Sequence, residues 1–359
     1  MYKLANAKIS SGRLSLATLL RLRVLLGHYC PVSPRVTLRL FSWIYCLLLP
    51  HLLCIYATEY LASREIKIFR VLPLLIEYCA NALLSLLTGQ EYFFKFVKGV
   101  ELIDSEMGFD HLPLITPATE YIFSMILVTK TLIGFISVFI HRTGIYLVLS
   151  STIMTVASAL NCLSSSLPFD LLRLRIRLLR QALISNLSPS INNTEDKIKI
   201  LWDNLRLYNK LVDKFTSTFH WHKLQITITT CCCFFSFIIN GYFASFAIKY
   251  SKDSGVGVDQ VYIIIGFVLF AAPSCLPSLF CELAHREVDK LKAAVGNLLL
   301  LCEDDELQSE LQLAVEYLDH RPFRVSICHV WSLDGSFILT FVGLCTAYLI
   351  TIVQIFGII

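Results

Sequence analysis

Charged residues are scarce in this chain: Asp, Glu, Lys and Arg make up 16% of its 359 residues, while 55% are hydrophobic. A soluble domain of ordinary composition carries roughly 25% charged residues. The length would allow two soluble domains, but apolar runs recur from residue 38 to the end. The composition therefore predicts one polytopic membrane domain over residues 1–359, with the lipid bilayer as its surroundings and no nucleic-acid partner.

Signals for covalent chemistry are also missing. There is no C-x-x-C motif with a matching second pair, which argues against a zinc site. None of the 13 cysteines falls in a segment that we place outside the cell, which argues against a disulfide framework. No P-loop, nucleophile elbow or paired-carboxylate site appears. We predict that the chain is not an enzyme and uses no cofactor or metal.

Seven apolar segments are long enough to cross a bilayer, whose core needs about 20 residues in a helix. They cover residues 38–57, 71–89, 119–140, 144–167, 224–248, 258–281 and 335–356. Of the 31 Lys and Arg residues, 24 lie in the N-terminal arm and in alternate loops, 6 lie in the other loops, and Lys130 lies in a span. Because basic residues accumulate on the cytosolic side, the N-terminus is expected inside and the C-terminus outside.

The expected cytosolic segments also have helical periodicity. Leucines alternate with Arg173, Arg177 and Arg180 at helical spacing over 169–183, as a continuation of the fourth span. Similar apolar stripes cover 201–222 and 284–315, and we expect a short helix to end at Ser332. Arg21 and Arg23 suggest an amphipathic N-terminal helix on the inner leaflet. The prediction is an all-α, seven-helix membrane protein with a cytosolic helical anchor at about 168–222 and 284–332.

One face of the last span carries the unusual polar groups. Ala347, Thr351, Gln354 and Ile358 fall at i, i+4, i+7 and i+11, which places them on one side of a helix. A primary amide in hydrocarbon is costly unless it meets water or a hydrogen-bond partner. This stripe should therefore face another helix or a water-filled path.

The end of the chain resembles the insect gustatory receptors. Their terminal signature is Thr-Tyr, five hydrophobic residues and Gln-Phe; here Tyr348 and Gln354 match, while Ala347 and Ile355 replace the Thr and the Phe. The Pro-Phe pair ending at Phe323 and the Trp-Ser-Leu-Asp run ending at Asp334 also look like that family. The resemblance implies a tastant-gated, non-selective cation channel of four subunits, homomeric or heteromeric, in the plasma membrane of gustatory neurons. It also implies a pore lined by the last helix, subunit contacts through the cytosolic anchor, and a pocket for a sugar or a bitter compound among the outer halves of the other spans.

Site roles follow from the resemblance and the topology together. Gln354, Thr351 and Ala347 are candidates to line the pore, and Ile355 and Ile358 could form an apolar constriction. The alternatives are an interhelical hydrogen bond for Gln354, back-bonding of Thr351 to its own helix, and lipid contact for Ile358. Tyr348, Phe323 and Asp334 are expected to be structural. The candidate ligand-pocket residues are Glu77, Tyr78, Lys130, Tyr146, Asn240, Tyr242, Phe246 and Tyr262. Pairing of Glu77 with Lys130 could bind ligand or simply join two helices.

Two other classes of membrane protein fit the sequence less well. A seven-helix G-protein-coupled receptor would need its N-terminus outside, against the distribution of basic residues, and the third and seventh spans lack Asp-Arg-Tyr and Asn-Pro-x-x-Tyr. A secondary transporter would need an internal repeat with broken helices. Pro273 and Pro277 could break the sixth span, but no matching segment appears elsewhere.

Overall fold

The structure is a computed structural model of the whole chain, and it describes residues 16–30, 36–62, 65–88, 91–108, 112, 114–141, 145–187, 193–250, 272–327 and 331–355. The helices, with one 3-10 turn (η2), are α1 (Leu16–Leu25), α2 (Val36–Ala62), α3 (Glu65–Thr88), α4 (Glu91–Glu106), α5 (Pro117–His141), α6 (Ile145–Asn186), α7 (Thr194–Thr218), α8 (His220–Tyr250), η2 (Ala272–Cys275), α10 (Leu276–Leu301), α11 (Asp305–His320) and α12 (Gly335–Ile355). Two short strands, β1 (Ser326–Ile327) and β2 (Trp331–Ser332), precede α12.

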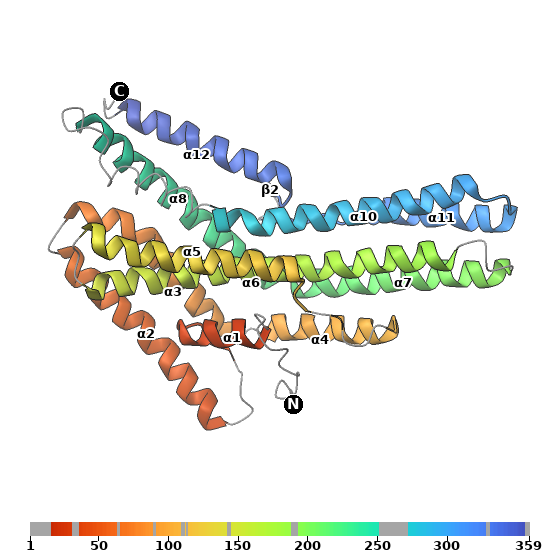
Figure 1. The fold of residues 1–359 in the computed structure, drawn as a ribbon, viewed down its shortest axis with the longest axis horizontal. Coiled ribbons are helices and arrows are strands. Elements are labelled where there is room, and N and C mark those ends of the chain that lie inside the picture. The colour runs from red at the N-terminus through yellow and green to blue at the C-terminus, as the bar shows by residue number, and fades with distance from the viewer. Residues whose placement is uncertain are drawn as a thin grey trace.

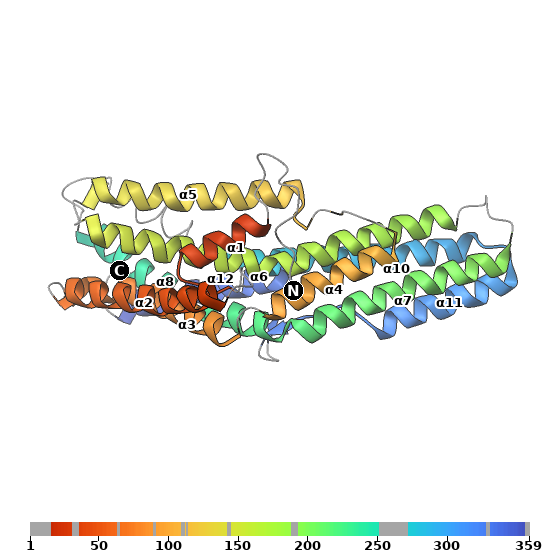
Figure 2. The ribbon, with the colours of Figure 1, turned by 90° about the horizontal axis from the view of Figure 1, so that it is seen from below.

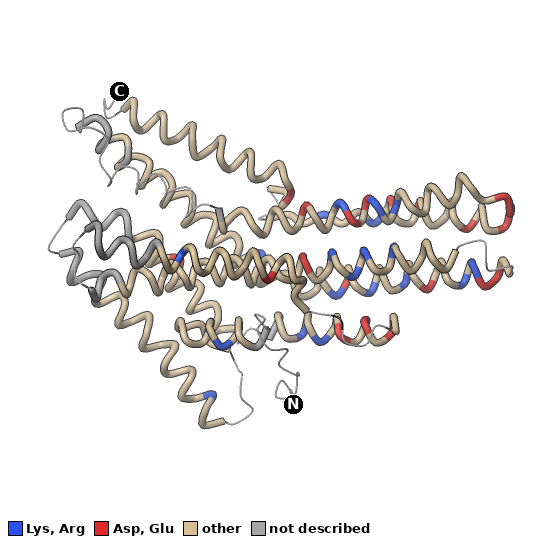
Figure 3. The backbone as a smooth tube through the Cα atoms, in the orientation of Figure 1, with Lys and Arg blue, Asp and Glu red and all other residues tan. Residues whose placement is uncertain are grey.

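The helices form two connected bundles along one long axis (Figures 1 and 2). The first, which we call the membrane bundle, contains α2, α3, α5, the first part of α6, α8 and α12. The second, which we call the base, contains α4, the rest of α6, α7, α10 and α11. Figure 3 shows acidic and basic residues gathered along the base, whereas α12 carries none. This separation of charge supports a bilayer around the membrane bundle.

Three described helices are long and apolar enough to cross a membrane: Val36–Ile55, His220–Phe243 and Gly335–Ile355. They overlap the first, fifth and seventh predicted spans. α3 and α5 overlap the second and third, while most of the sixth, at 258–271, lies outside the described residues.

α6 belongs to both bundles because it runs without interruption for 42 residues, about 63 Å at 1.5 Å per residue. This confirms the predicted helical continuation of the fourth span. Pro168 lies inside the helix. Just before it, the hydroxyls of Ser164, Ser165 and Ser166 each donate to the carbonyl oxygen four residues earlier. Proline removes a backbone donor, so this short segment is the weakest part of the helix's hydrogen-bond ladder.

Buried aromatic and leucine side chains form the core of the base. Phe169 of α6 contacts Phe215 and Phe219 at the end of α7, and Phe323 packs against Phe215 with ring centroids 5.5 Å apart. At one edge, Arg175 of α6 donates two hydrogen bonds to Asp104 of α4, at 3.1 and 2.6 Å. The Arg175 side chain is fully buried and that of Asp104 is 8% exposed.

Two helix predictions for the base are wrong. The stripe over 284–315 is divided between α10 and α11, because Asp304 ends the continuity by accepting hydrogen bonds from the backbone N–H groups of Glu306 and Leu307. The helix expected to end at Ser332 is a β-hairpin, in which Ser326 pairs with Ser332 and Ile327 pairs with Trp331.

The N-terminal helix also differs from its prediction. α1 does not keep Arg23 at a lipid surface; the side chain is 3% exposed and donates to Asn161 of α6 at 3.1 Å. The end of α1 is further fixed by Tyr78 of α3, whose hydroxyl donates to the carbonyl oxygen of Leu26 at 2.9 Å. α1 is therefore part of the packed protein, because Arg23 and the carbonyl oxygen of Leu26 have hydrogen-bond partners on α6 and α3.

Candidate functional site

α12 is, with α2, one of the two least covered of the three described helices that are long and apolar enough to cross a membrane. Its buried residues, Phe337, Phe341, Cys345 and Val353, form one face that packs mainly against α8. Phe234 of α8 contacts both Phe341 and Tyr348 there, with ring centroids 6.4 and 5.6 Å apart. A single chain therefore covers only one side of this apolar helix.

The predicted polar stripe lies on the uncovered side. Gln354 follows Cys345 by nine residues, which is half a turn, about 180°, at 100° per residue, and Ala347, Thr351 and Gln354 are all exposed. Gln354 makes no hydrogen bond to any part of the chain that the structure describes. The Thr351 hydroxyl donates to the carbonyl oxygen of Ala347 at 2.9 Å, so it does back-bond to its own helix.

The other predicted residues of the last helix that the structure describes are also exposed. Ile355 is 73% exposed, and Tyr348 is 52% exposed although its ring touches Phe234. Ile358 lies outside the described residues. The uncovered side of α12 thus combines a narrow polar stripe with apolar flanks.

Two carboxylates hold the start of α12. Asp334 accepts hydrogen bonds from the backbone N–H groups of Ser336 and Phe337 at 2.9 and 3.2 Å, as an N-cap does. Glu282 of α10 accepts from the backbone N–H of Gly335 at 3.2 Å and from Arg286 at 2.9 Å. The hydrogen bond from Arg286 is the main reason that the pKa of Glu282 lies below its usual value. The first turn of α12 is therefore tied directly to the base.

Phe323 anchors the same junction from the other side. Its side chain is 4% exposed, and its carbonyl oxygen accepts a hydrogen bond from Nδ1 of His285 on α10 at 2.9 Å. The hairpin between Phe323 and Asp334 is thus fixed at both ends, which makes the last helix an extension of the base.

A second group of polar residues lies inside the membrane bundle. This polar cluster consists of Glu77 and Asn81 on α3, Lys130 on α5, Ser158 on α6 and Thr229 on α8. The Ser158 hydroxyl donates to Glu77 at 2.7 Å, and Asn81 donates to Thr229 at 3.5 Å. Glu77 and Lys130 are 1% and 5% exposed and interact electrostatically. A buried carboxylate needs such partners, because removing an unpaired charge from water costs on the order of several kcal/mol.

Of the other predicted pocket residues, Tyr78, Asn240 and Tyr242 have contacts outside this cluster. Tyr78 points to the end of α1, with its ring 5.6 Å from that of His28. Asn240 donates to the carbonyl oxygen of Ser236 one turn earlier. Tyr242 contacts its neighbour Phe243. Tyr262 and the side chains of Tyr146 and Phe246 lie outside what the structure describes.

The sequence analysis missed Ser158 and Thr229 as members of the cluster. A signal for part of it was present, since Glu77 and Asn81 are spaced i, i+4 on α3 and must share one face. Their partners come from α6 and α8, whose polar residues are too numerous to single out without the packing.

Comparison with known proteins gives a family match and several similar solved structures, two of which are described here. The sequence model of the 7tm chemosensory receptor family matches residues 114–355. The insect olfactory receptor OR5 from Machilis hrabei in complex with eugenol has a similar structure, with a TM-score of 0.63 at 12% identity over 94% of this chain and 97% of that one. A second structure of the same receptor gives a TM-score of 0.59 with the same identity and coverage. No curated protein matches the sequence significantly.

Proposed function

Because this chain belongs to the 7tm chemosensory receptor family of insects, we propose that it is a gustatory receptor subunit that forms a tastant-gated cation channel. Family membership confirms the predicted chemoreceptor and the prediction that the chain is not an enzyme. The all-α, seven-span fold is likewise confirmed by its similarity to the olfactory receptor. Taste, ion conduction and the pore helix are the parts that we propose.

The observation that carries the proposal is the uncovered polar stripe of α12. Four copies of Gln354 around a central axis would offer amide oxygens and N–H groups to a hydrated cation, without a fixed charge that would hold it tightly. Thr351 and Ala347 would continue this lining, and Ile355 and Ile358 would narrow it. The absence of a hydrogen-bond partner for Gln354 within the described chain supports this role over an interhelical bond inside one subunit.

The orientation follows from the charges. We place the base in the cytosol, where it joins four subunits, identical or of related receptors, and the C-terminus of α12 outside the plasma membrane of a gustatory neuron. The concentration of Lys and Arg along the base supports this orientation (Figure 3). Asp334 and Glu282, the two carboxylates that hold the start of α12, would then transmit movement between the pore and the base.

The tastant would enter from outside among the helices of the membrane bundle. Machilis hrabei OR5, which has a similar fold, is described in complex with eugenol, a small aromatic molecule. In this chain we place a sugar or a bitter compound beside the outer parts of α3, α5, α6 and α8. The polar cluster would form the floor of that pocket, with Glu77 and Lys130 as the groups that sense its occupant. The predicted aromatics Tyr146, Tyr242, Phe246 and Tyr262 would stack on the ligand from above.

Current recording tests this function. The receptor is expressed in cells without other taste receptors, and whole-cell current is measured across a panel of sugars and bitter compounds. We expect a ligand-evoked cation current that needs no G protein, and Gln354→Ala should change conductance or permeability while surface expression stays normal. Ser336→Ala, at the exposed start of the same helix, is the control. Ligand-dependent uptake without current, or a response that requires a G protein, would contradict the proposal.

A further inference from the structure

Two cysteines on neighbouring helices meet inside the membrane bundle. The sulfur atoms of Cys54 on α2 and Cys79 on α3 lie 3.4 Å apart. Both side chains are partly exposed, and both pack against a small buried cluster that includes Leu53, Tyr78 and Met154 from α2, α3 and α6. Because the two thiols belong to different helices, a bond between them would change how α2 and α3 are held together.

The two sulfur atoms are close enough to react with each other. A disulfide bond joins sulfur atoms about 2.05 Å apart, so those of Cys54 and Cys79 need to approach by about 1.4 Å. Rotation about the Cα–Cβ bond of a cysteine moves its sulfur atom while the helix stays in place. The pair is therefore placed to form a disulfide without rearrangement of the bundle.

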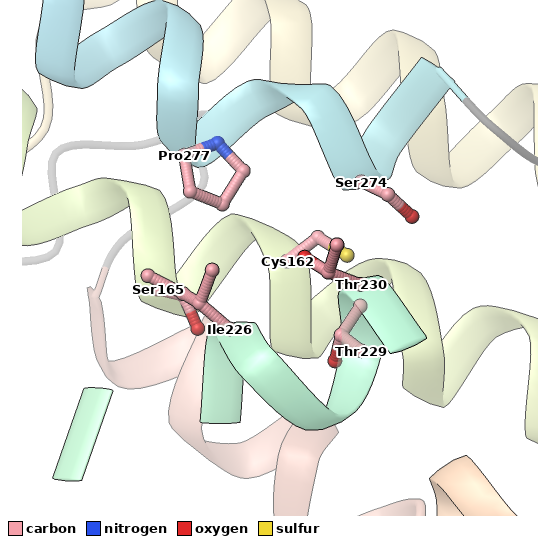
Figure 4. A pocket seen from close by; sticks show the side chains of 7 residues that line it. All are labelled: Cys162, Ser165, Ile226, Thr229, Thr230, Ser274 and Pro277. Carbon is pink, nitrogen blue, oxygen red and sulfur yellow. The ribbon is translucent and has the colours of Figure 1, made fainter. Parts of the chain in front are cut away.

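Cys162 has different surroundings. Its thiol lines a space at the junction of α6, α8 and η2 that has room for about one water molecule (Figure 4). The other described side chains around that space carry hydroxyl groups or hydrocarbon, as Ser165 and Thr230 do. A sulfenic acid formed on Cys162 would have no second thiol in that space to react with, whereas one formed on Cys54 would have Cys79 beside it.

The position of the pair limits the oxidant and protects the product. In the orientation proposed above, Cys54 lies near the outer end of the first predicted span and Cys79 near the middle of the second. A charged oxidant is costly to bring into hydrocarbon, so the reagent must be small and uncharged. Thiol systems of the cytosol reduce disulfides, whereas the outer side of a membrane is oxidising. A disulfide at this level would therefore persist once formed.

We propose that Cys54 and Cys79 form a redox modification site, which a small hydroperoxide such as hydrogen peroxide oxidises to a disulfide between α2 and α3. The thiolate of one cysteine attacks a peroxide oxygen, which gives a sulfenic acid and hydroxide, and the hydroxide takes up the proton that the thiol lost to form water. The second thiol then attacks the sulfenic sulfur, and another water leaves as the S–S bond forms. Two thiols and one hydrogen peroxide thus give one disulfide and two waters, and two electrons pass from sulfur to oxygen.

The disulfide would act on the tastant pocket, an effect that rests on the proposed channel function. Glu77, which we place at the floor of that pocket, precedes Cys79 by two residues on α3. A covalent link to α2 would fix this part of α3 and restrict its movement when a ligand binds. Oxidation should therefore reduce the tastant-evoked current, and a thiol reductant should restore it.

Mass spectrometry tests the site without any need for gating. The purified full-length receptor is treated with hydrogen peroxide, its remaining thiols are blocked with N-ethylmaleimide, and it is digested without reductant. We expect a linked pair of peptides that contain Cys54 and Cys79 and that separate on treatment with dithiothreitol. Cys79→Ser should abolish this linked pair. Cys231→Ser, which removes an exposed cysteine of α8, is the control and should keep it.

Absence of the linked peptides from the peroxide-treated wild type would overturn the site whatever the receptor's ligand proves to be. The second readout is current. In cells that give a tastant-evoked current, peroxide should lower it reversibly in the wild type and in Cys231→Ser but not in Cys79→Ser. An equal loss of current in Cys79→Ser would overturn the effect of the disulfide on gating. If the linked peptides form and no tastant evokes current, the channel function fails and the redox site stands.

Discussion

Removing one partner of the buried Arg175–Asp104 pair should destabilise the base strongly. Arg175 donates two hydrogen bonds to Asp104, which gives the bidentate geometry of a strong charge-assisted pair. Because the Arg175 side chain is fully buried, Asp104→Ala would leave its guanidinium in the protein interior without that carboxylate. Breaking a buried pair in this way costs about 3 to 5 kcal/mol. At about 2 °C per kcal/mol for a large domain, the expected loss of Tm is about 6 to 10 °C.

The assay is the thermal unfolding of detergent-solubilised receptor, followed by the fraction that stays monodisperse after heating. Glu106→Ala is a matched control on the same helix, because Glu106 also pairs with a basic residue, Lys210, at 2.5 Å. In that pair both side chains are more than a third exposed. Exposed pairs contribute about 0 to 1 kcal/mol, so this variant should unfold near the wild-type temperature.

A double variant separates the loss of the pair from the loss of packing. Asp104→Leu combined with Arg175→Met replaces the pair with apolar side chains, which is often neutral or stabilising in buried sites. It should recover most of the Tm lost in Asp104→Ala. Equal Tm values for Asp104→Ala and Glu106→Ala would refute the reasoning, because burial would then make no difference to the value of the pair.

Three further changes test other parts of the structure. Asp334→Ala removes the N-cap of α12 and should lower stability by about 1 kcal/mol, while Asp334→Asn, which can still cap, should keep most of it; equal losses in unfolding experiments would argue against capping. Gly241→Val places a side chain where a Cβ atom would already lie 2.8 Å from Leu349 of α12, so it should shift the ligand response and cost about 1 to 3 kcal/mol. Gly296→Val, with no atom within 4 Å, is its control, and identical behaviour of the two variants would exclude tight α8–α12 packing. Burial, aided by the charge of Arg23, lowers the pKa of His28 from 6.5 to about 3. Between these values the unfolded chain binds more protons, so stability falls as pH falls, by up to about 1.4 kcal/mol per pH unit. His28→Gln should therefore reduce the loss of Tm between about pH 7.5 and about pH 5, and an unchanged loss would show that His28 does not titrate as described.

Features that depend on chain periodicity could be predicted from the sequence. The continuation of α6 into the base and the polar face of α12 follow from apolar spacing at 3.6 residues. The hairpin before α12 was missed although Phe323, Val325 and Ile327 are all buried and alternate with more exposed residues, which is the period of a strand. Each strand has only two residues, which is too short for alternation in the sequence to distinguish a strand from a helix.

Features that depend on which helices meet could not be predicted in this way. Arg175 lies among three other arginines of α6, and no local signal says that it alone is fully buried opposite Asp104. Likewise, Arg23 was expected at a lipid surface because its partner, Asn161, is 138 residues away in the chain. Long-range pairing between helices, and not helix formation itself, limits what the sequence reveals about the candidate site.

The proline in α6 has a mechanical consequence. A continuous rod of about 63 Å would turn a tilt of about 3° at one end into a displacement of about 3 Å at the other. The segment from Ser164 to Pro168 is the part of α6 that bends most easily, because the backbone there lacks the hydrogen bond that Pro168 cannot donate. Bending at this segment would let the two halves of α6 pivot while the cores of the membrane bundle and of the base stay rigid. The stiffness of this one segment would then set how far a small movement in the membrane bundle displaces the base.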